Sequence, residues 1–284
     1  MPKLRDFLNL MKPSIMLLVL LTGAAALMLE GSLHASDGKF WGILLGLMLT
    51  GGCANGLNQY FERDIDAQMG RTKNRRPLAT GKMLPKTALY FVVSCGVLAI
   101  ILFAVFFNWL SAFTAFATIA FYSFFYTLWL KPRTHLNIVI GGAAGAMAPI
   151  IAWAAATGTL AWTPWLLFLI VFFWTPPHFW ALALCVKNDY ARVHIPMLPV
   201  IKGDSETRRQ IFLYSFVLVA ISLLLHVGLL YLTAALVLGG LFVYKAWKLL
   251  KGQEQNYAWG LFKYSIVYLT ALFVVIMADV AITK

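Results

Sequence analysis

Hydrophobic residues along this chain form long uninterrupted runs, and short polar stretches separate one run from the next. Each run approaches the ~20 residues that a helix needs to cross a ~30 Å hydrocarbon core. The pattern therefore predicts nine membrane-spanning helices. The predicted spans are residues 14–30, 41–60, 87–107, 110–130, 138–156, 165–186, 210–226, 228–247 and 261–280.

Composition supports this interpretation, because 61% of the residues are hydrophobic and only 12% are charged. An ordinary soluble domain carries about twice that share of charge. Small residues four apart, as in Gly52–Gly56 and Gly141–Gly145, predict close contacts between helices. We expect an all-α polytopic membrane protein with the lipid bilayer as its solvent, and one domain over residues 1–284.

Positive charge is confined to alternate loops. With nine spans, all but two of the 23 lysines and arginines fall on one side of the membrane, and the exceptions are Lys39 and Lys284. The positive-inside rule places that side, and the N-terminus, in the cytoplasm, with the C-terminus on the opposite side. The net charge of +12 thus reflects topology, and no nucleic-acid partner is expected.

Familiar soluble-enzyme motifs are missing. The three cysteines make no paired spacing, so we expect no disulfide framework and no cysteine-based metal site. The histidines form no HExxH arrangement, and no Walker or GxGxxG loop occurs.

Acidic residues end the second span in the stretch "NQYFERDID". Asn58, Glu62 and Asp66 are spaced i, i+4, i+8 and share one helix face, whereas Asp64 points elsewhere. Acids at membrane depth usually face a partner or a cavity and mark function. One amide and two carboxylates suit Mg²⁺, which commonly completes its shell with substrate phosphate oxygens.

The following loop, "GRTKNRRPLATGK", supplies Arg71, Lys73, Arg75 and Arg76, which are suitable donors to phosphate. Taken alone, these bases are more typical of membrane anchors. Combined with the acids, they favour a site for a diphosphate and Mg²⁺.

A second polar cluster follows the sixth span and contains Lys187, Asp189, Tyr190 and Arg192. It lies four spans after the first cluster and on the same side. We therefore predict that the two clusters face each other across a central cavity that opens near the cytoplasmic face.

The two polar clusters lie in the first and third of these three stretches of the sequence: "NQYFERDIDAQMGRTKNRRPL", "LKPRTHLNIVIGGAAGAMAPIIAWAA" and "TPPHFWALALCVKNDYARVHIPMLPVIKGD". The first resembles the aspartate-rich motif of the UbiA-type intramembrane prenyltransferases, and all three together resemble the branch of that family that farnesylates haem. The likeness covers roughly residues 55–205. It departs from the general family pattern at Gln59, at Glu62 and at His194.

The resemblance implies farnesyl diphosphate and haem B as substrates, haem O as product and Mg²⁺ as cofactor. It also implies the bacterial cytoplasmic (inner) membrane and an assembly partner such as a haem A synthase or a terminal oxidase factor. The implied catalytic residues are Asn58, Glu62, Asp66, Lys187 and Asp189, and the implied metal ligands are Asn58, Glu62, Asp66 and Asp189. The implied diphosphate-binding residues are Arg71, Lys73, Arg75, Arg76, Lys131, Arg133, Lys187 and Arg192.

His178 follows Pro176 and Pro177 in the sixth span, ~13 Å deeper than Lys187 if the helix is regular. On the residues alone, two roles are equally good: a bond to a backbone carbonyl freed by a proline kink, or a contact with haem iron. The intact "PPHFW" resemblance favours haem binding by His178 and Trp180.

Two other functions stay open at this point. Another UbiA-type enzyme that prenylates a quinone precursor would share the acidic stripe, although it should lack "PPHFWALAL" and "PMLPVIKG". A secondary transporter for an anionic lipid or metabolite would use the acids for ion coupling.

Overall fold

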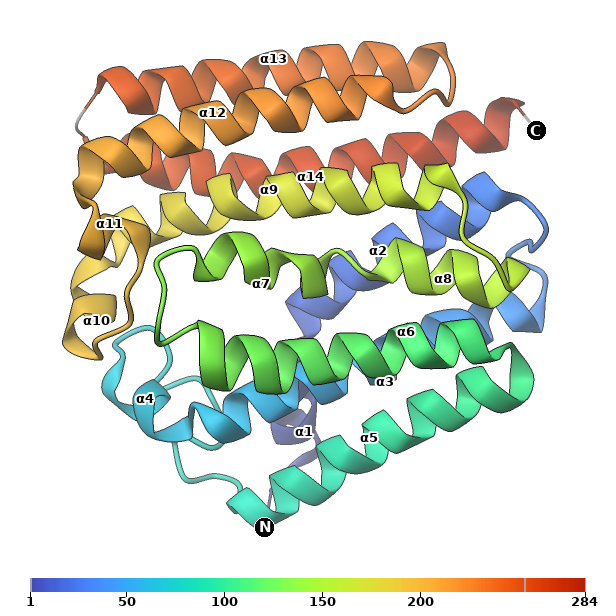
Figure 1. The fold of residues 1–284 in the computed structure, drawn as a ribbon, viewed down its shortest axis with the longest axis horizontal. Coiled ribbons are helices and arrows are strands. Elements are labelled where there is room, and N and C mark those ends of the chain that lie inside the picture. Colours follow the sequence, from blue (N-terminus) through green and yellow to red (C-terminus); the bar gives the residue numbers. More distant parts are fainter. Residues whose placement is uncertain (1, 253, 284) are drawn as a thin grey trace.

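The computed structural model describes residues 2–252 and 254–283, and throughout these ranges the regular structure is helical. Helices α1 to α14 and the π-helix η1 follow one another along the chain (Figure 1). Their bounds are α1 Leu4–Met11, α2 Pro13–Glu30, α3 Gly38–Phe61, α4 Arg63–Gln68, α5 Pro85–Phe106, α6 Trp109–Ala120, η1 Phe121–Leu130, α7 Asn137–Gly145, α8 Ala148–Thr157, α9 Trp162–Cys185, α10 Lys187–Arg192, α11 Leu198–Ile201, α12 Gly203–Leu224, α13 Leu229–Lys251 and α14 Gln255–Thr283.

The nine predicted spans are confirmed within the described part of the chain. Spans four and five each consist of two joined elements, α6 with η1 and α7 with α8. The seventh differs most at its start, since α12 begins at Gly203 and the hydropathy pattern indicated residue 210. Backbone hydrogen bonds carry a helix beyond the apolar region, so charged residues such as Asp204 and Glu206 occupy its first turn.

The spans lie side by side as a bundle (Figure 1). The short helices α4, α10 and α11 gather at one end, drawn at the left, and the C-terminus lies at the other. This end therefore receives both polar clusters predicted from the sequence, and the two lie on the same side of the bundle.

Glycines bring several helices into close contact, as predicted. A Cβ atom at Gly56 of α3 would collide with Val92 of α5, and one at Gly141 of α7 would collide with Tyr126 of η1. Gly145 has open space around it instead. The close approaches thus hold α3 against α5 and η1 against α7, and Glu62 and Lys131 directly follow α3 and η1.

The sequence pattern did not predict α1, a short amphipathic helix. It buries Leu10 and Met11 and exposes Leu4 and Leu8. Lys12 follows in a left-handed conformation (φ 58°), and Pro13 starts α2. This turn brings the Lys12 side chain back toward α3.

Candidate functional site

The acidic stripe forms as predicted, although not on one uninterrupted helix. Helix α3 ends at Phe61 and α4 begins at Arg63, so Glu62 lies at the junction. Helical hydrogen bonding nonetheless continues, because Glu62 N donates to Asn58 O (3.0 Å) and Asp66 N donates to Glu62 O (2.8 Å). All three side chains are buried on one side, with residue exposures of 2%, 5% and 2% for Asn58, Glu62 and Asp66.

Asp64 behaves differently from its neighbours, as the helical spacing indicated. Its side chain is 84% exposed and lies 3.8 Å from the Arg63 guanidinium. An exposed pair of this kind contributes little to stability.

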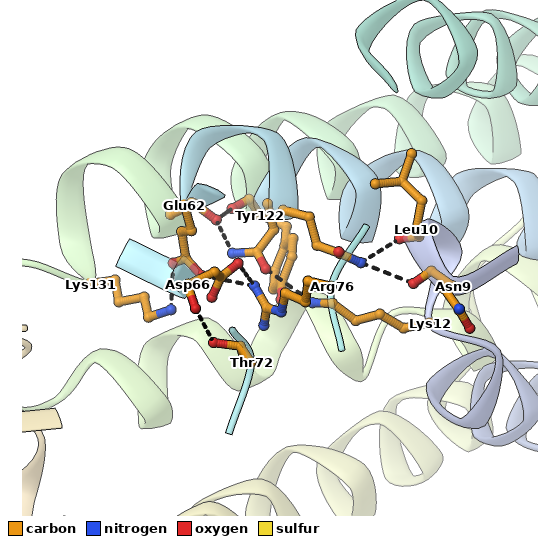
Figure 2. A network of polar contacts seen from close by, with 12 residues as sticks. Asn9, Leu10, Lys12, Glu62, Asp66, Thr72, Arg76, Tyr122 and Lys131 are labelled. Carbon is orange, nitrogen blue, oxygen red and sulfur yellow. Dashed lines mark hydrogen bonds and ion pairs between the residues drawn. The ribbon is translucent and has the colours of Figure 1, made fainter. Parts of the chain in front are cut away.

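Three cations from distant parts of the chain converge on the stripe (Figure 2). Lys131 pairs with Glu62, and Arg76 pairs with Asp66 and lies 3.7 Å from Glu62. Lys12 Nζ donates to the Asn58 amide oxygen (3.0 Å). Arg76 and Lys131 thus pair with the two buried acids and Lys12 binds the amide of the same stripe, which fixes three segments relative to one another.

The loop after α4 positions Arg76 through its own hydrogen bonds. Thr72 Oγ1 donates to Asp66 O (2.8 Å), and Arg76 N donates to Thr72 O (3.0 Å). The chain therefore folds back as a series of turns beneath the acids. Thr72 is buried there, and Figure 2 shows it directly below Asp66.

The π-helical turns of η1 position Lys131. Lys131 N donates to Tyr126 O (2.8 Å), and Thr127 Oγ1 donates to Tyr122 O (2.8 Å). Asn58 Nδ2 in turn donates to Thr127 Oγ1 (3.3 Å). π-helical turns are rare and frequently occur at functional sites.

The charges of the site are strongly coupled. Burial opposes ionisation of Glu62, but the Lys131 ammonium, together with Arg76 and Lys12, holds the pKa of this carboxyl below its ordinary value. Burial raises the pKa of Asp66, and Arg76 opposes that rise. Burial, with the nearby Arg76 charge, lowers the pKa of Lys12 well below its usual range. Three basic groups thus face two carboxylates, and a further anion beside Lys12 would favour its protonated form.

The other predicted phosphate donors are dispersed. Lys73, Arg75, Arg133 and Arg192 are exposed, and Arg133 Nη1 donates to Trp129 O (2.7 Å). Arg71 is half-buried, and its Nε is buried without a hydrogen-bond partner among the described residues. Among the predicted donors, Arg76 and Lys131 are the two whose described ion pairs reach the stripe.

Lys12 was not predicted as a site residue. The sequence pattern places it only among the basic residues on the predicted cytoplasmic side, just before the first span. The one available signal was its position immediately before Pro13, because proline favours the first position of a helix and so indicates a turn at Lys12.

The second cluster does meet the first, through Asp189. Its carboxylate accepts a hydrogen bond from the Arg71 backbone N (3.2 Å) and lies against Gly70, where a Cβ atom would stand 3.3 Å from it. Lys187 instead pairs with Asp204 at 2.8 Å, and both are partly exposed. No group of three or more His, Cys, Asp or Glu side chains suited to a metal occurs in the described residues, so ligation by Asp189 stays a prediction.

His178 is buried between aromatic rings within α9. Its ring stacks on Trp174 (centroids 4.3 Å apart) and on Phe262 of α14 (4.7 Å). Its Nδ1 lies 2.7 Å from Ser265 Oγ, which itself donates to Phe262 O (2.7 Å). Ser265 must therefore accept from Nδ1–H, which leaves Nε2 with the lone pair.

One of the two roles considered for His178 was a hydrogen bond to a backbone carbonyl freed by a proline kink. The structure shows a different partner. Helix α9 runs through Pro176 and Pro177 without interruption, and His178 Nδ1 bonds to the hydroxyl of Ser265 on α14. A neutral imidazole with a free Nε2 is compatible with haem iron, and this role stays a prediction. Trp180 is 1% exposed and packs edge-on against Tyr214 of α12, so the structure places it on a different side of α9.

Comparison with known proteins agrees with this architecture. The model of the UbiA prenyltransferase family matches residues 18–273, which is most of the chain. This chain belongs to the UbiA prenyltransferase family. Its match includes the acidic stripe, the loop that carries Arg76 and the end of η1.

Relatives within the family are similar over almost the whole length. A protein from Synechocystis sp. named protoheme IX farnesyltransferase is 46% identical over 97% of this chain and 89% of its own. A protein of the same name from Gloeobacter violaceus is 45% identical over 97% of this chain and 92% of its own.

Solved structures of the family share the fold. A digeranylgeranylglyceryl phosphate synthase superposes with a TM-score of 0.78 at 18% identity, over 99% of both chains. A UbiA homologue from Archaeoglobus fulgidus bound to DMAPP and Mg²⁺ gives 0.66 at 16% identity, over 95% of this chain and 99% of its own. The fold is therefore that of the UbiA membrane prenyltransferases, and this protein is an integral membrane protein.

Proposed function

We propose that this protein transfers the farnesyl group of farnesyl diphosphate to a vinyl group of haem B, giving haem O and releasing diphosphate. The observation that carries the proposal is the buried stripe of Asn58, Glu62 and Asp66 with its three converging cations. Relatives named protoheme IX farnesyltransferase at 45–46% identity support haem as the acceptor.

The basic residues bind and activate the leaving group. Lys131, Arg76 and Lys12 present donors to diphosphate oxygens in a buried region, where electrostatic interactions are stronger than in water. As the allylic C–O bond breaks, negative charge accumulates on the diphosphate. Fixed cations that stabilise this developing charge lower the barrier to ionisation.

The donor chemistry of the acidic stripe fits Mg²⁺. Asn58 supplies an amide oxygen, and Glu62 and Asp66 supply two carboxylates, all of which are hard oxygen ligands. When bound there, Mg²⁺ neutralises charge on the diphosphate. The same carboxylates would then share their negative charge between the metal and the cations Lys131 and Arg76.

Bond changes beyond ionisation occur on the substrates. The haem vinyl group attacks the farnesyl cation, a carbon–carbon bond forms, and water adds to the resulting cation. Loss of one proton, which the released diphosphate can accept, then gives the hydroxyethylfarnesyl side chain. Tyr122 lies beside Glu62 in Figure 2, where its ring can shield positive charge on the allyl group. Phe125, another aromatic residue of η1, is 41% exposed and stacks on Trp129, which places it away from the stripe.

The site opens toward the cytoplasm in this proposal. The excess of basic residues on the side of α4 and α10 supports a cytoplasmic N-terminus and a C-terminus across the bacterial inner membrane. Reporter fusions at Lys82 and Lys202 should both give the cytoplasmic signal. An external signal from either would contradict this orientation.

Product analysis tests the function directly. Purified protein is incubated with haem B and with geranyl, farnesyl or geranylgeranyl diphosphate, with and without Mg²⁺, and products are identified by mass spectrometry. We expect a Mg²⁺-dependent haem product that carries one farnesyl group and one added water. Prenylation of a quinone precursor in place of haem would overturn the choice of acceptor, and absence of diphosphate release would overturn the enzyme assignment.

A further inference from the structure

A second basic region lies beside the acidic stripe and is separate from it. A cavity of about 770 Å³ lies between α1 and the loop that follows α4. Four basic residues line it: Lys3, Arg5, Arg75 and Lys82. The side chains of the consecutive residues Arg75 and Arg76 therefore lie in different sites. Arg76 pairs with Asp66, whereas Arg75 lines this cavity.

The positive charge of the cavity is only partly offset, because one acidic residue stands among four basic ones. The one acid in its lining, Asp6, accepts a hydrogen bond from the Lys3 backbone N (2.9 Å) and so caps the start of α1. None of the four basic residues forms an ion pair with any residue that the structure describes. Asn9 and Asn74 add neutral polar groups to the lining. The cavity thus has the chemistry of a site for a phosphate group.

The surroundings of the cavity indicate a membrane surface. On α1, the exposed leucines Leu4 (76%) and Leu8 (50%) lie on a different face of the helix from Arg5 and Asn9. Leu84, two residues after Lys82, is 71% exposed at the start of α5. Short amphipathic helices with such faces lie in the interface, where basic residues meet lipid headgroups.

We propose that this cavity binds the phosphate group of an anionic phospholipid of the bilayer, with its acyl chains beside the exposed leucines of α1. The site goes beyond the proposed transferase activity. Gln59 Nε2 donates to Asn9 O (3.1 Å) and Leu10 O (2.8 Å), and Lys12 follows α1 and reaches Asn58. A bound headgroup would therefore hold the helix that positions Lys12.

Lipid titration with native mass spectrometry tests the proposal. Purified protein in detergent is titrated with phosphatidylglycerol or phosphatidylcholine, and the bound lipids are counted. The double variant Arg75→Gln, Lys82→Gln should bind phosphatidylglycerol roughly 30-fold more weakly, since each basic residue near a headgroup contributes about fivefold. Lys86→Gln is the matched control, because Lys86 is exposed four residues from Lys82 and does not line the cavity.

Additional experiments test whether the bound phosphate belongs to a lipid or to a free anion, and whether the variants remain folded. Arg75→Lys, Lys82→Arg keeps the charge and should keep the preference, and thermal unfolding in detergent shows whether the variants remain folded. Competition with inorganic phosphate or diphosphate at equal concentration should not displace the lipid. Displacement would assign the cavity to a free anion and overturn the proposal. Equal binding of the two lipids by the unaltered protein, or a preference unchanged in the double glutamine variant, would overturn it too.

Discussion

Two sites with buried carboxylates in this protein differ in the partners that bind those carboxylates. Glu62 and Asp66 lie at the end of the bundle that holds α4 and α10, and side-chain cations pair with both. Asp279 lies near the opposite end on α14, is 3% exposed, and accepts a hydrogen bond from the Tyr231 backbone N (2.7 Å). It thereby caps the start of α13, where the helix dipole also favours negative charge.

The difference separates a binding site from a structural cap. Backbone groups cannot move away from Asp279 without unwinding α13, and a Cβ atom at Gly228 would collide with its carboxylate. Lys131 and Arg76, by contrast, are long side chains that can exchange a carboxylate for a phosphate. In these two sites, partners on long side chains accompany the proposed ligand binding, and a partner on the backbone accompanies a role in stability.

The largest expected effect is on the stripe itself. Glu62→Gln and Asp66→Asn keep the side-chain size and remove the charge, so each should lower turnover by about 10²–10³-fold, the scale of losing one preorganised electrostatic group. Turnover is measured as haem product by mass spectrometry. Thermal unfolding in detergent should show that both variants remain folded, and activity near that of the unaltered protein would remove the stripe from the site.

Asp279→Ala should have the opposite effect, with a loss of stability and no loss of turnover. The backbone N–H of Tyr231 would lose its acceptor, so we expect a loss of about 1–3 kcal/mol in stability, with activity per folded molecule unchanged. Thermal unfolding and the specific activity of the monodisperse fraction measure the two quantities. Asp279→Asn retains an oxygen acceptor and should lose less, and a selective loss of activity in the folded fraction would contradict the structural assignment.

His178 represents an intermediate case, because one ring nitrogen is satisfied by Ser265 and Nε2 remains available. His178→Ala should weaken haem B binding by roughly tenfold, about 1.4 kcal/mol, and leave the affinity for farnesyl diphosphate unchanged. A haem titration followed in the Soret band measures the change. An unaltered spectrum and affinity would assign His178 to packing between Trp174 and Phe262 alone.

The smallest effect is expected at Asp64. Asp64→Asn removes a carboxylate from the same stretch of sequence, but its side chain is exposed and pairs only weakly with Arg63. Turnover should change by less than about twofold, since exposed pairs contribute little. A loss as large as that of Asp66→Asn would show that burial and helix face do not decide which acids act.

The sequence predicted those features that depend on short-range periodicity. Apolar run length located the nine spans, and the four-residue spacing placed Asn58, Glu62 and Asp66 together and excluded Asp64. Two partners of this stripe come from positions 46 and 69 residues away, in the pairs Lys12–Asn58 and Glu62–Lys131. Such pairings depend on how whole helices pack, so local patterns did not identify Lys12, and they did not distinguish Arg76 from the equally basic Arg75.

The π-helical form of η1 has a consequence for insertions and deletions. A π turn holds one residue more than an α turn, so the length of this segment, as much as its side chains, determines where Lys131 lies. Removing a single residue near Phe124 would let one π turn close as an α turn, so the helix beyond it would keep its orientation. Removing a single residue from the α-helical stretch of α6 would instead rotate Lys131 by about 100° around the helix axis. We therefore expect a deletion within η1 to disturb the pairing of Lys131 with Glu62 less than a deletion within α6.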